Sequence, residues 1–178
     1  MNFDQAKMAV INSIQFFLDD QELGLMVGEI TDDDYKMLSR GLGDLEWPWA
    51  LNSIGNEENC ISFCFKITGG HIPDGIAMGL YELEEGRLSI HMMESFVRDD
   101  LNHPLQGRMI YFTLVSAYLF LTAFEGNSLD FVDALNQDLE KKYQSYGFSA
   151  PYKVNNSMLQ TISIDRLKAS ITEFSEND

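Results

Sequence analysis

The chain has 178 residues, of which 28 are acidic and 12 basic, so its formal net charge is −16. Apolar residues make up 45% of the chain, which indicates a single globular domain over residues 1–178 rather than a disordered protein. This charge balance argues against nucleic acid as a partner, because neutralising phosphates requires clustered lysine and arginine. This charge suits a cationic ligand, but an acidic surface that aids solubility is the better explanation.

The N-terminal residues lack the basic region and the small-residue cleavage site of a signal peptide. The cysteines, Cys60 and Cys64, would lie about 13 Å apart along a strand, too far for a disulfide. No second pair of ligands accompanies them, so we expect no metal site. The longest apolar run, residues 109–124, falls short of the ~20 residues that span a bilayer. We expect a cytoplasmic protein without a membrane partner.

The N-terminal third of the chain contains two predicted helices and one predicted strand. Apolar residues at helical spacing predict a helix over residues 3–18, and weak alternation predicts a strand over residues 24–30. Thr31 is placed to cap a second helix, whose first turn carries three aspartates next to the positive end of the helix dipole. This helix should stop near Gly41 or Gly43.

Both tryptophans flank a single proline in the segment Trp47-Pro48-Trp49. Pro48 is expected to hold Trp47 extended and to stop a helix from entering from the N-terminal side. The pair has two interpretations. It is either a hydrophobic plug that closes the core or an aromatic wall of a substrate pocket, which could stack on a cation.

The middle of the chain predicts an antiparallel meander of three strands, over residues 60–67, 76–83 and 88–97. A helix that is apolar on nearly every face, residues 109–124, should be buried in the core. The strand that follows it, residues 128–132, completes a parallel crossover.

The C-terminal part predicts a helix over residues 134–146, with Asp133 as its cap and Gly147 as its stop. A strand over residues 158–164, a short helix over residues 165–174 and a disordered acidic tail complete the chain. The predicted fold is therefore a mixed α/β fold with a twisted, mostly antiparallel sheet flanked by helices.

Two residue pairs are candidates for chemistry. Alternation along the strand 88–97 places Glu94 on a largely apolar face, where desolvation would raise its pKa towards that of a useful base. This face would also contain Leu88, Ile90, Met92 and Phe96. His91 is a second candidate base, and a purely structural Glu94 is the alternative. In the helix 134–146, Asn136 and Tyr143 lie seven residues apart on the apolar stripe and should point inward, either as functional groups or as satisfied core residues.

The order of these elements resembles the acetyl-CoA-binding half of the GNAT superfamily of N-acetyltransferases, over about residues 75–150. The residues that carry the resemblance, at the family's spacing, are Asn136, Leu139, Lys142, Tyr143, Gly147 and Phe148. The resemblance implies acetyl-CoA as co-substrate and Tyr143 as the general acid that protonates the departing thiolate. It also implies Asn136 as a cofactor contact and Glu94 as the base.

The turn that opens the long helix matches the family's phosphate-binding turn at Gly107, whereas Pro104 and Met109 replace its usual basic or amide residue and its usual small residue. Backbone N–H groups at such a helix start bind phosphate. The resemblance implies diphosphate binding by Gln106, Gly107, Arg108 and Met109, and pairing of Phe96 and Val97 with the pantetheine amides.

The function implied is direct transfer of an acetyl group to a primary amine of a small molecule or peptide, without a metal. The acidic surface and Trp47 with Trp49 make a cationic amine a reasonable acceptor. A catalytically inactive GNAT-like binding or assembly module is the alternative, and the altered phosphate turn favours it. An acyl group longer than acetyl and a homodimer both stay open.

Overall fold

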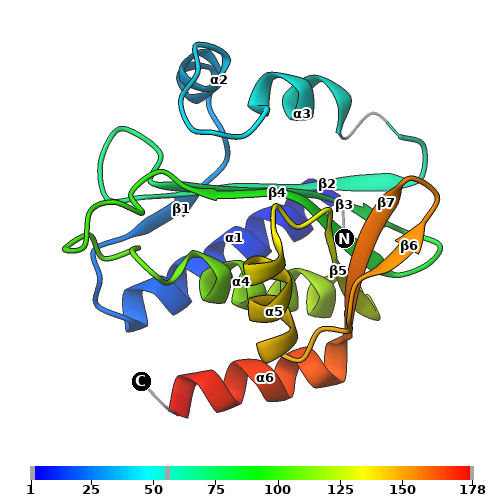
Figure 1. The fold of residues 1–178 in the computed structure, drawn as a ribbon. Helices are drawn as coiled ribbons and strands as arrows, with labels where there is room; N and C mark the ends of the chain where they lie inside the picture. Colours follow the sequence, from blue (N-terminus) through cyan, green and yellow to red (C-terminus); the bar gives the residue numbers. More distant parts are fainter. Residues whose placement is uncertain (1–2, 55–56, 177–178) are drawn as a thin grey trace.

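The computed structural model describes residues 3–54 and 57–176, and Figure 1 shows one sheet with helices on both of its faces. The strands are β1 (Met26–Gly28), β2 (Cys60–Thr68), β3 (Gly75–Glu82), β4 (Arg87–Ser95), β5 (Ser128–Val132), β6 (Tyr152–Val154) and β7 (Ser157–Ser163). The helices are α1 (Phe3–Asp20), α2 (Asp32–Ser39), α3 (Trp47–Ser53), α4 (Met109–Ala123), α5 (Gln137–Ser145) and α6 (Ile164–Glu176).

The seven strands lie in the order β1-β2-β3-β4-β5-β7-β6. Neighbours are antiparallel except β4 and β5, which run parallel and are joined by α4. The mixed, mostly antiparallel sheet with one parallel crossover is therefore confirmed.

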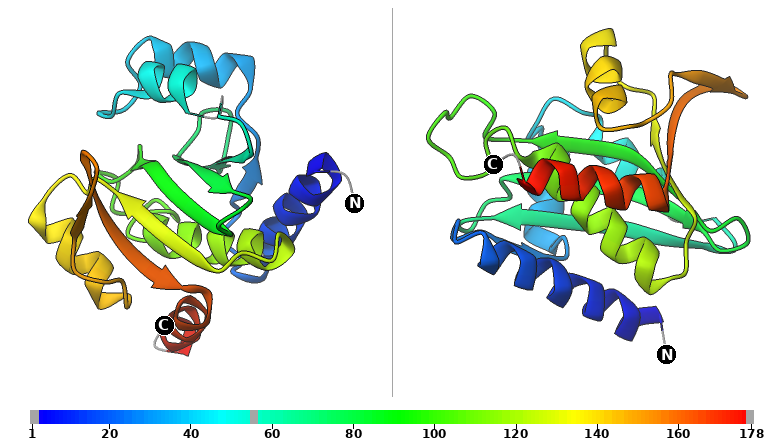
Figure 2. Two further views of the ribbon diagram at one scale, coloured as in Figure 1. Left: turned by 90° about the vertical axis from the view of Figure 1, so that its right-hand side faces the viewer. Right: turned by 90° about the horizontal axis from the view of Figure 1, so that it is seen from below.

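Helices lie on both faces of the sheet (Figure 2), and each face carries an apolar cluster. The larger cluster joins the sheet to α1 and α4, and ten of the fifteen residues of α4 are buried there, as its apolar sequence predicts. The smaller cluster lies under α2 and α3 and centres on Trp47, which is fully buried. Within the described ranges, no helix combines the length and the apolar character that crossing a bilayer requires.

Four local predictions were wrong or incomplete. Pro48 does not hold Trp47 extended, because it occupies the first turn of α3, where a missing N–H costs nothing. The cap of α5 is Asn136 rather than Asp133. Strand β6 was not predicted, and α6 continues to Glu176. The end of the predicted disordered tail, residues 177–178, lies outside the described residues.

The pairing of β3 with β4 contains one irregularity that decides where later side chains point. Met78 pairs with Met92 while its neighbour Gly79 pairs with Ile90, so His91 is an extra residue in β4. Such a bulge shifts the alternation of the strand by one position. Ile90 consequently packs into the core under α4, and Met92 packs into the cluster under α2 and α3.

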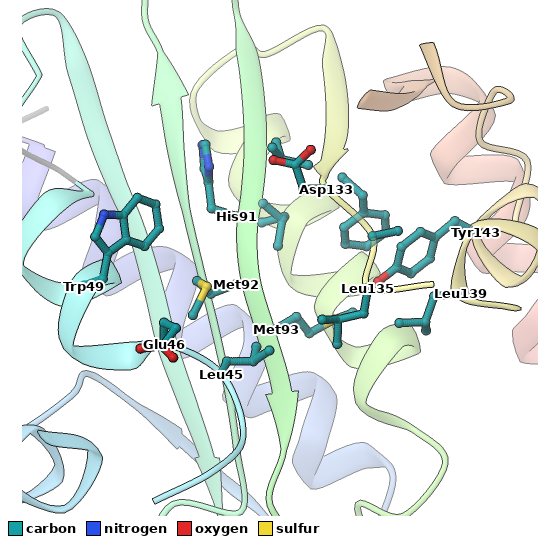
Figure 3. Close-up of a pocket in the computed structure, with 14 residues that line it drawn as sticks. Leu45, Glu46, Trp49, His91, Met92, Met93, Asp133, Leu135, Leu139 and Tyr143 are labelled. Atoms are coloured by element: carbon teal, nitrogen blue, oxygen red, sulfur yellow. The ribbon is translucent and has the colours of Figure 1, made fainter. Parts of the chain in front are cut away.

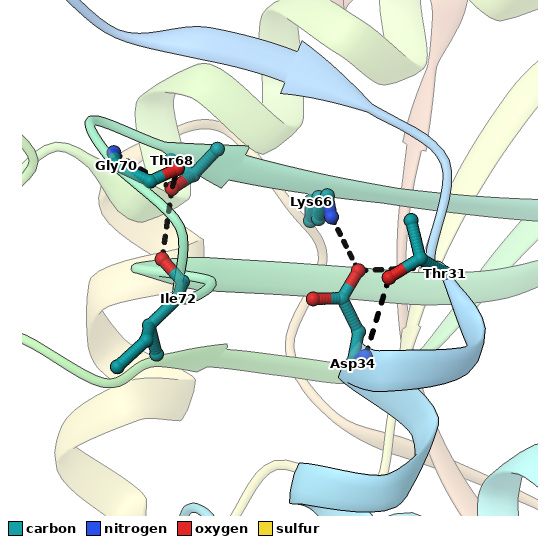
Figure 4. A network of polar contacts seen from close by, with 6 residues as sticks. All are labelled: Thr31, Asp34, Lys66, Thr68, Gly70 and Ile72. Carbon is teal, nitrogen blue, oxygen red and sulfur yellow. Dashed lines mark hydrogen bonds and ion pairs between the residues drawn. The ribbon is translucent and has the colours of Figure 1, made fainter.

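Helix α2 is fixed to the sheet by a buried ion pair (Figure 4). The carboxylate of Asp34 accepts hydrogen bonds from the Lys66 ammonium on β2 and from the N–H of Thr31, and the Thr31 hydroxyl accepts from the N–H of Asp34. Asp34 is only 1% exposed. Burial alone would raise its pKa, but these hydrogen bonds and the charge of Lys66 lower it overall.

Replacing Lys66 with methionine should lower the free energy of unfolding by about 3–5 kcal/mol at neutral pH, because Asp34 would stay buried without its counter-charge. Since the pKa of Asp34 is lowered in the folded state, the pair stabilises the protein above the unfolded-state pKa, near 3.8, and this contribution is lost as the pH falls through the folded-state pKa. Urea unfolding of both proteins should therefore give curves that converge below pH 3.8. A difference that does not change with pH would contradict this account.

Candidate functional site

Strands β4 and β5 separate halfway along their length and leave a cavity between them (Figure 3). They pair only over residues 87–90 and 128–131. The cavity has a volume of about 590 Å³ and extends from α3 across β4 to α5. Its lining residues are Leu45, Glu46, Trp49, Ile90, His91, Met92, Met93, Phe131, Val132, Asp133, Ala134, Leu135, Leu139 and Tyr143.

The edge of β4 that borders this gap carries backbone groups that β5 does not pair. The N–H of Phe96 donates to the carbonyl of Asp74 at 2.8 Å, so it faces β3 and is not available to a ligand. Because successive N–H groups of a strand point to opposite edges, those of Met93 and Ser95 face the gap. The hydroxyl of Ser95 is also buried without a hydrogen-bond partner in the described part of the chain. This edge could therefore pair with an extended polar ligand.

Tyr143 forms one wall of the cavity. It is 6% exposed, and its ring stacks on Phe131 at a centroid distance of 4.1 Å. Its hydroxyl points into the cavity (Figure 3), and no hydrogen bond to it is found among the described residues. Burial raises the pKa of Tyr143 to about 12, so this hydroxyl stays protonated at neutral pH and can donate a proton.

His91 and Asp133 lie near each other at one end of the cavity (Figure 3). Burial lowers the pKa of His91, and the carboxylates of Glu57 and Asp133 oppose this shift without reversing it. The imidazole is therefore largely neutral near pH 7 and can accept a proton. Because Ile90 packs into the core under α4, alternation along β4 turns the adjacent His91 to the opposite face, which carries α3.

Glu94 is held by hydrogen bonds from the segment that leads into α3. Its carboxylate accepts from the N–H of Asp44 at 2.7 Å, the N–H of Leu45 at 3.3 Å and the indole N–H of Trp47 at 2.8 Å. This close approach needs a glycine at position 43, where a Cβ would lie 2.5 Å from the carboxylate. Glu94 is 7% exposed and is not among the residues that line the cavity. This geometry matches the interpretation of Glu94 as a structural residue rather than as a base.

The predicted face of Glu94 needs a correction. The bulge at His91 places Glu94 with Met92 and Phe96, whereas Leu88 and Ile90 belong to the opposite core. Simple alternation was wrong for this strand, because it assumed that no extra residue interrupts the pairing.

The two tryptophans have different environments. Trp47 is a fully buried plug whose indole bonds to Glu94, which matches the first interpretation of the pair. Trp49 is 57% exposed and lines the cavity, as the second interpretation expects. Only Trp49 is therefore placed to contact a ligand.

Asn136 does not point inward as predicted. It is exposed, and its side-chain oxygen accepts from the N–H of Leu139, which caps α5. The prediction failed because α5 begins three residues later than expected, which removes Asn136 from the apolar stripe. Its side-chain amide N–H groups remain available to a ligand.

The turn before α4 lines a second hollow, of about 520 Å³, together with Tyr111, Tyr146 and Phe174. Gln106, Gly107 and Arg108 border it, and a Cβ added to Gly107 would meet no atom within 4 Å. Met109 does not fill this opening, because its side chain is buried and packs beside Gly75. The start of α4 is therefore open to an anion, with the Arg108 guanidinium 2.7 Å from the carbonyl of Pro104.

Two charged cavity residues, Glu46 and Asp133, were not predicted as functional. Asp133 was interpreted only as a helix cap. Its position directly after a buried parallel strand was a usable signal, because ligands bind beyond the carboxyl ends of such strands. Glu46 carries no comparable signal, since only the fold brings α3 to β4.

No protein-family model and no curated protein sequence matches this chain. Solved structures with a similar backbone include an uncharacterized protein from Bacillus halodurans (TM-score 0.63, 12% identity, 86% of this chain and 91% of that chain). A spermidine N-acetyltransferase chimera from Vibrio cholerae and hSSAT is also similar (TM-score 0.59, 10% identity, 82% and 99%). So is the PaiA N-acetyltransferase from Thermoplasma acidophilum in complex with coenzyme A (TM-score 0.55, 8% identity, 78% and 98%). The chain therefore has the fold of the GNAT acetyltransferases.

Proposed function

We propose that this protein transfers an acetyl group from acetyl-CoA to a primary amine. One observation carries the proposal. The protonated hydroxyl of Tyr143, to which the described residues make no hydrogen bond, projects into the cavity between the separated strands β4 and β5, in a chain with the GNAT fold. An acid at this position is what a departing thiolate requires.

The residues present suit acetyl-CoA, which supplies an acetyl thioester when bound. The open N–H group of Ser95 would pair with a pantetheine amide, and the cofactor arm would continue along the backbone of Phe96 and Val97. Gln106, Gly107 and Arg108 would hold the diphosphate at the start of α4, and the buried Met109 would contribute through its backbone. Asn136 would contact the cofactor arm through its amide N–H groups.

The chemistry assigned to the chain is a direct transfer. Of the two candidate bases, the geometry supports His91, since the carboxylate of Glu94 is already engaged by three donors. His91 would take a proton from the ammonium group of the acceptor, and the neutral amine would then attack the acetyl carbonyl. The N–H of Met93 would stabilise the oxyanion that develops there. Tyr143 would give its proton to the sulfur as the C–S bond breaks and would regain one from solvent.

Calorimetric titration with acetyl-CoA, followed by measurement of thiol release with a panel of amines, tests this function. We expect saturable binding and amine-dependent release of free CoA. Absence of binding at millimolar acetyl-CoA would contradict the proposal and favour an inactive binding module. Parallel titrations with longer acyl-CoA molecules would show whether acetyl is the preferred group, since Leu135 and Leu139 line the cavity near Tyr143.

A further inference from the structure

The cavity has an unusual balance of charge and apolar surface. Its charged lining residues are the carboxylates of Glu46 and Asp133, and neither lysine nor arginine is among the described residues that line it. Ten of the fourteen lining residues are apolar. A carboxylate on the ligand would meet no counter-charge here, and a chain of several ammonium groups would lie against apolar walls.

Asp133 is held in one orientation by the neighbouring strand β7. Its N–H donates to the carbonyl of Met158 at 2.8 Å, and one of its carboxylate oxygens accepts from the N–H of Met158 at 2.8 Å. These bonds stabilise a left-handed backbone with a φ of 50°, which is uncommon outside glycine. The second carboxylate oxygen has no hydrogen bond among the described residues, so it can accept one from a ligand.

The walls of the cavity differ on the two sides of β4 (Figure 3). Tyr143, Leu135 and Leu139 lie on the side of α5, where the transferred group is proposed to bind. Trp49 lies on the side of α3, and its exposed indole together with the thioether of Met92 forms an apolar surface. A molecule with its nitrogen beside His91 and Asp133 would extend over Met92 towards Trp49.

We propose that the acceptor is a monoamine whose nitrogen is attached to an apolar or aromatic body, with Asp133 as the residue that binds its ammonium group. This inference rests on the proposed function. Asp133 and Trp49 are specificity-determining residues in this assignment, and the body of the amine packs against the Trp49 ring.

The test uses Asp133→Asn, because asparagine also tolerates a left-handed backbone and can still accept from the N–H of Met158. Calorimetry without cofactor should show phenylethylamine and hexylamine binding at least tenfold more weakly to this variant than to the parent. Acetyl-CoA affinity should not change. Asp138→Asn, which removes the same charge from the exposed start of α5 outside the cavity lining, is the matched control and should bind like the parent.

Three outcomes overturn the inference. The first is equal amine affinity of the parent and Asp133→Asn. The second is a preference for spermidine over both monoamines. The third is an effect of Glu46→Gln as large as that of Asp133→Asn, which would indicate a diamine held at both ends. Amine binding is measured without cofactor, so a failure of this inference can be told apart from a failure of the proposed function. Only the absence of acetyl-CoA binding would overturn the proposed function.

Discussion

Replacing Tyr143 with phenylalanine should lower the turnover number by about 10²–10⁴-fold, the usual contribution of a positioned general acid. The change removes only the hydroxyl, so the ring should keep its stacking on Phe131. The free energy of unfolding should stay within about 0.5 kcal/mol of the parent, because no hydrogen bond to that hydroxyl is found in the described part of the chain. Steady-state thiol release and urea unfolding measure the two quantities.

Calorimetry should give Tyr143→Phe the acetyl-CoA affinity of the parent, since the proposed acid acts only as the thiolate leaves. Tyr118→Phe is a matched control, because Tyr118 belongs to α4 and does not line the cavity. Its turnover should equal that of the parent. Unchanged turnover of Tyr143→Phe would remove Tyr143 from the acid role.

Replacing Glu94 with alanine should lower the free energy of unfolding by about 3–5 kcal/mol. Three donors would lose a charged acceptor, and hydrogen bonds to charged groups are each worth about 1.5–3 kcal/mol without being strictly additive. The buried indole N–H of Trp47 would be left without its partner, and the segment that places α3 over the cavity would lose its anchor. Urea unfolding followed by tryptophan fluorescence measures the loss.

The substitution Glu94→Gln distinguishes an anchor from a base. Glutamine keeps an accepting oxygen, so part of the stability should return and turnover should recover with it. His91→Gln should instead remove the limb of the pH profile on which activity falls as pH drops through the lowered pKa of His91. If Glu94→Gln were as stable as the parent but inactive, Glu94 would be the base after all.

Local sequence signals predicted most of the fold, because the residues that start, stop and orient these helices and strands lie close together in the sequence. The capping box of Thr31 and the helical spacing of Val10, Ile14 and Leu18 each involve residues within a few positions of one another. Strand β5 follows the long apolar helix closely, so few arrangements other than a parallel crossover could place it in the sheet. Strand β6 was missed because its three residues are all exposed and show no alternation.

The site was less predictable because contacts between distant segments decide it. Sequence alone cannot show that Asp133 is held by Met158 of β7, which leaves Asn136 to cap α5. Nor can it show that Glu94 meets the backbone before α3, fifty positions earlier in the case of Asp44. The buried position of Tyr143, by contrast, was predicted from the sequence, because Tyr143 lies on the apolar stripe of its own helix.

The extra residue makes β4 one residue longer than its pairing with β3 requires. Deleting His91 alone would place Ile90 and Met92 next to each other opposite Gly79 and Met78, so strict alternation would return and Glu94 would keep its present face. Deleting Met93 instead, with the bulge retained, would turn the Glu94 carboxylate towards the core beneath α4. Position 91 is therefore where this strand can lose a residue without reversing the side chains that follow.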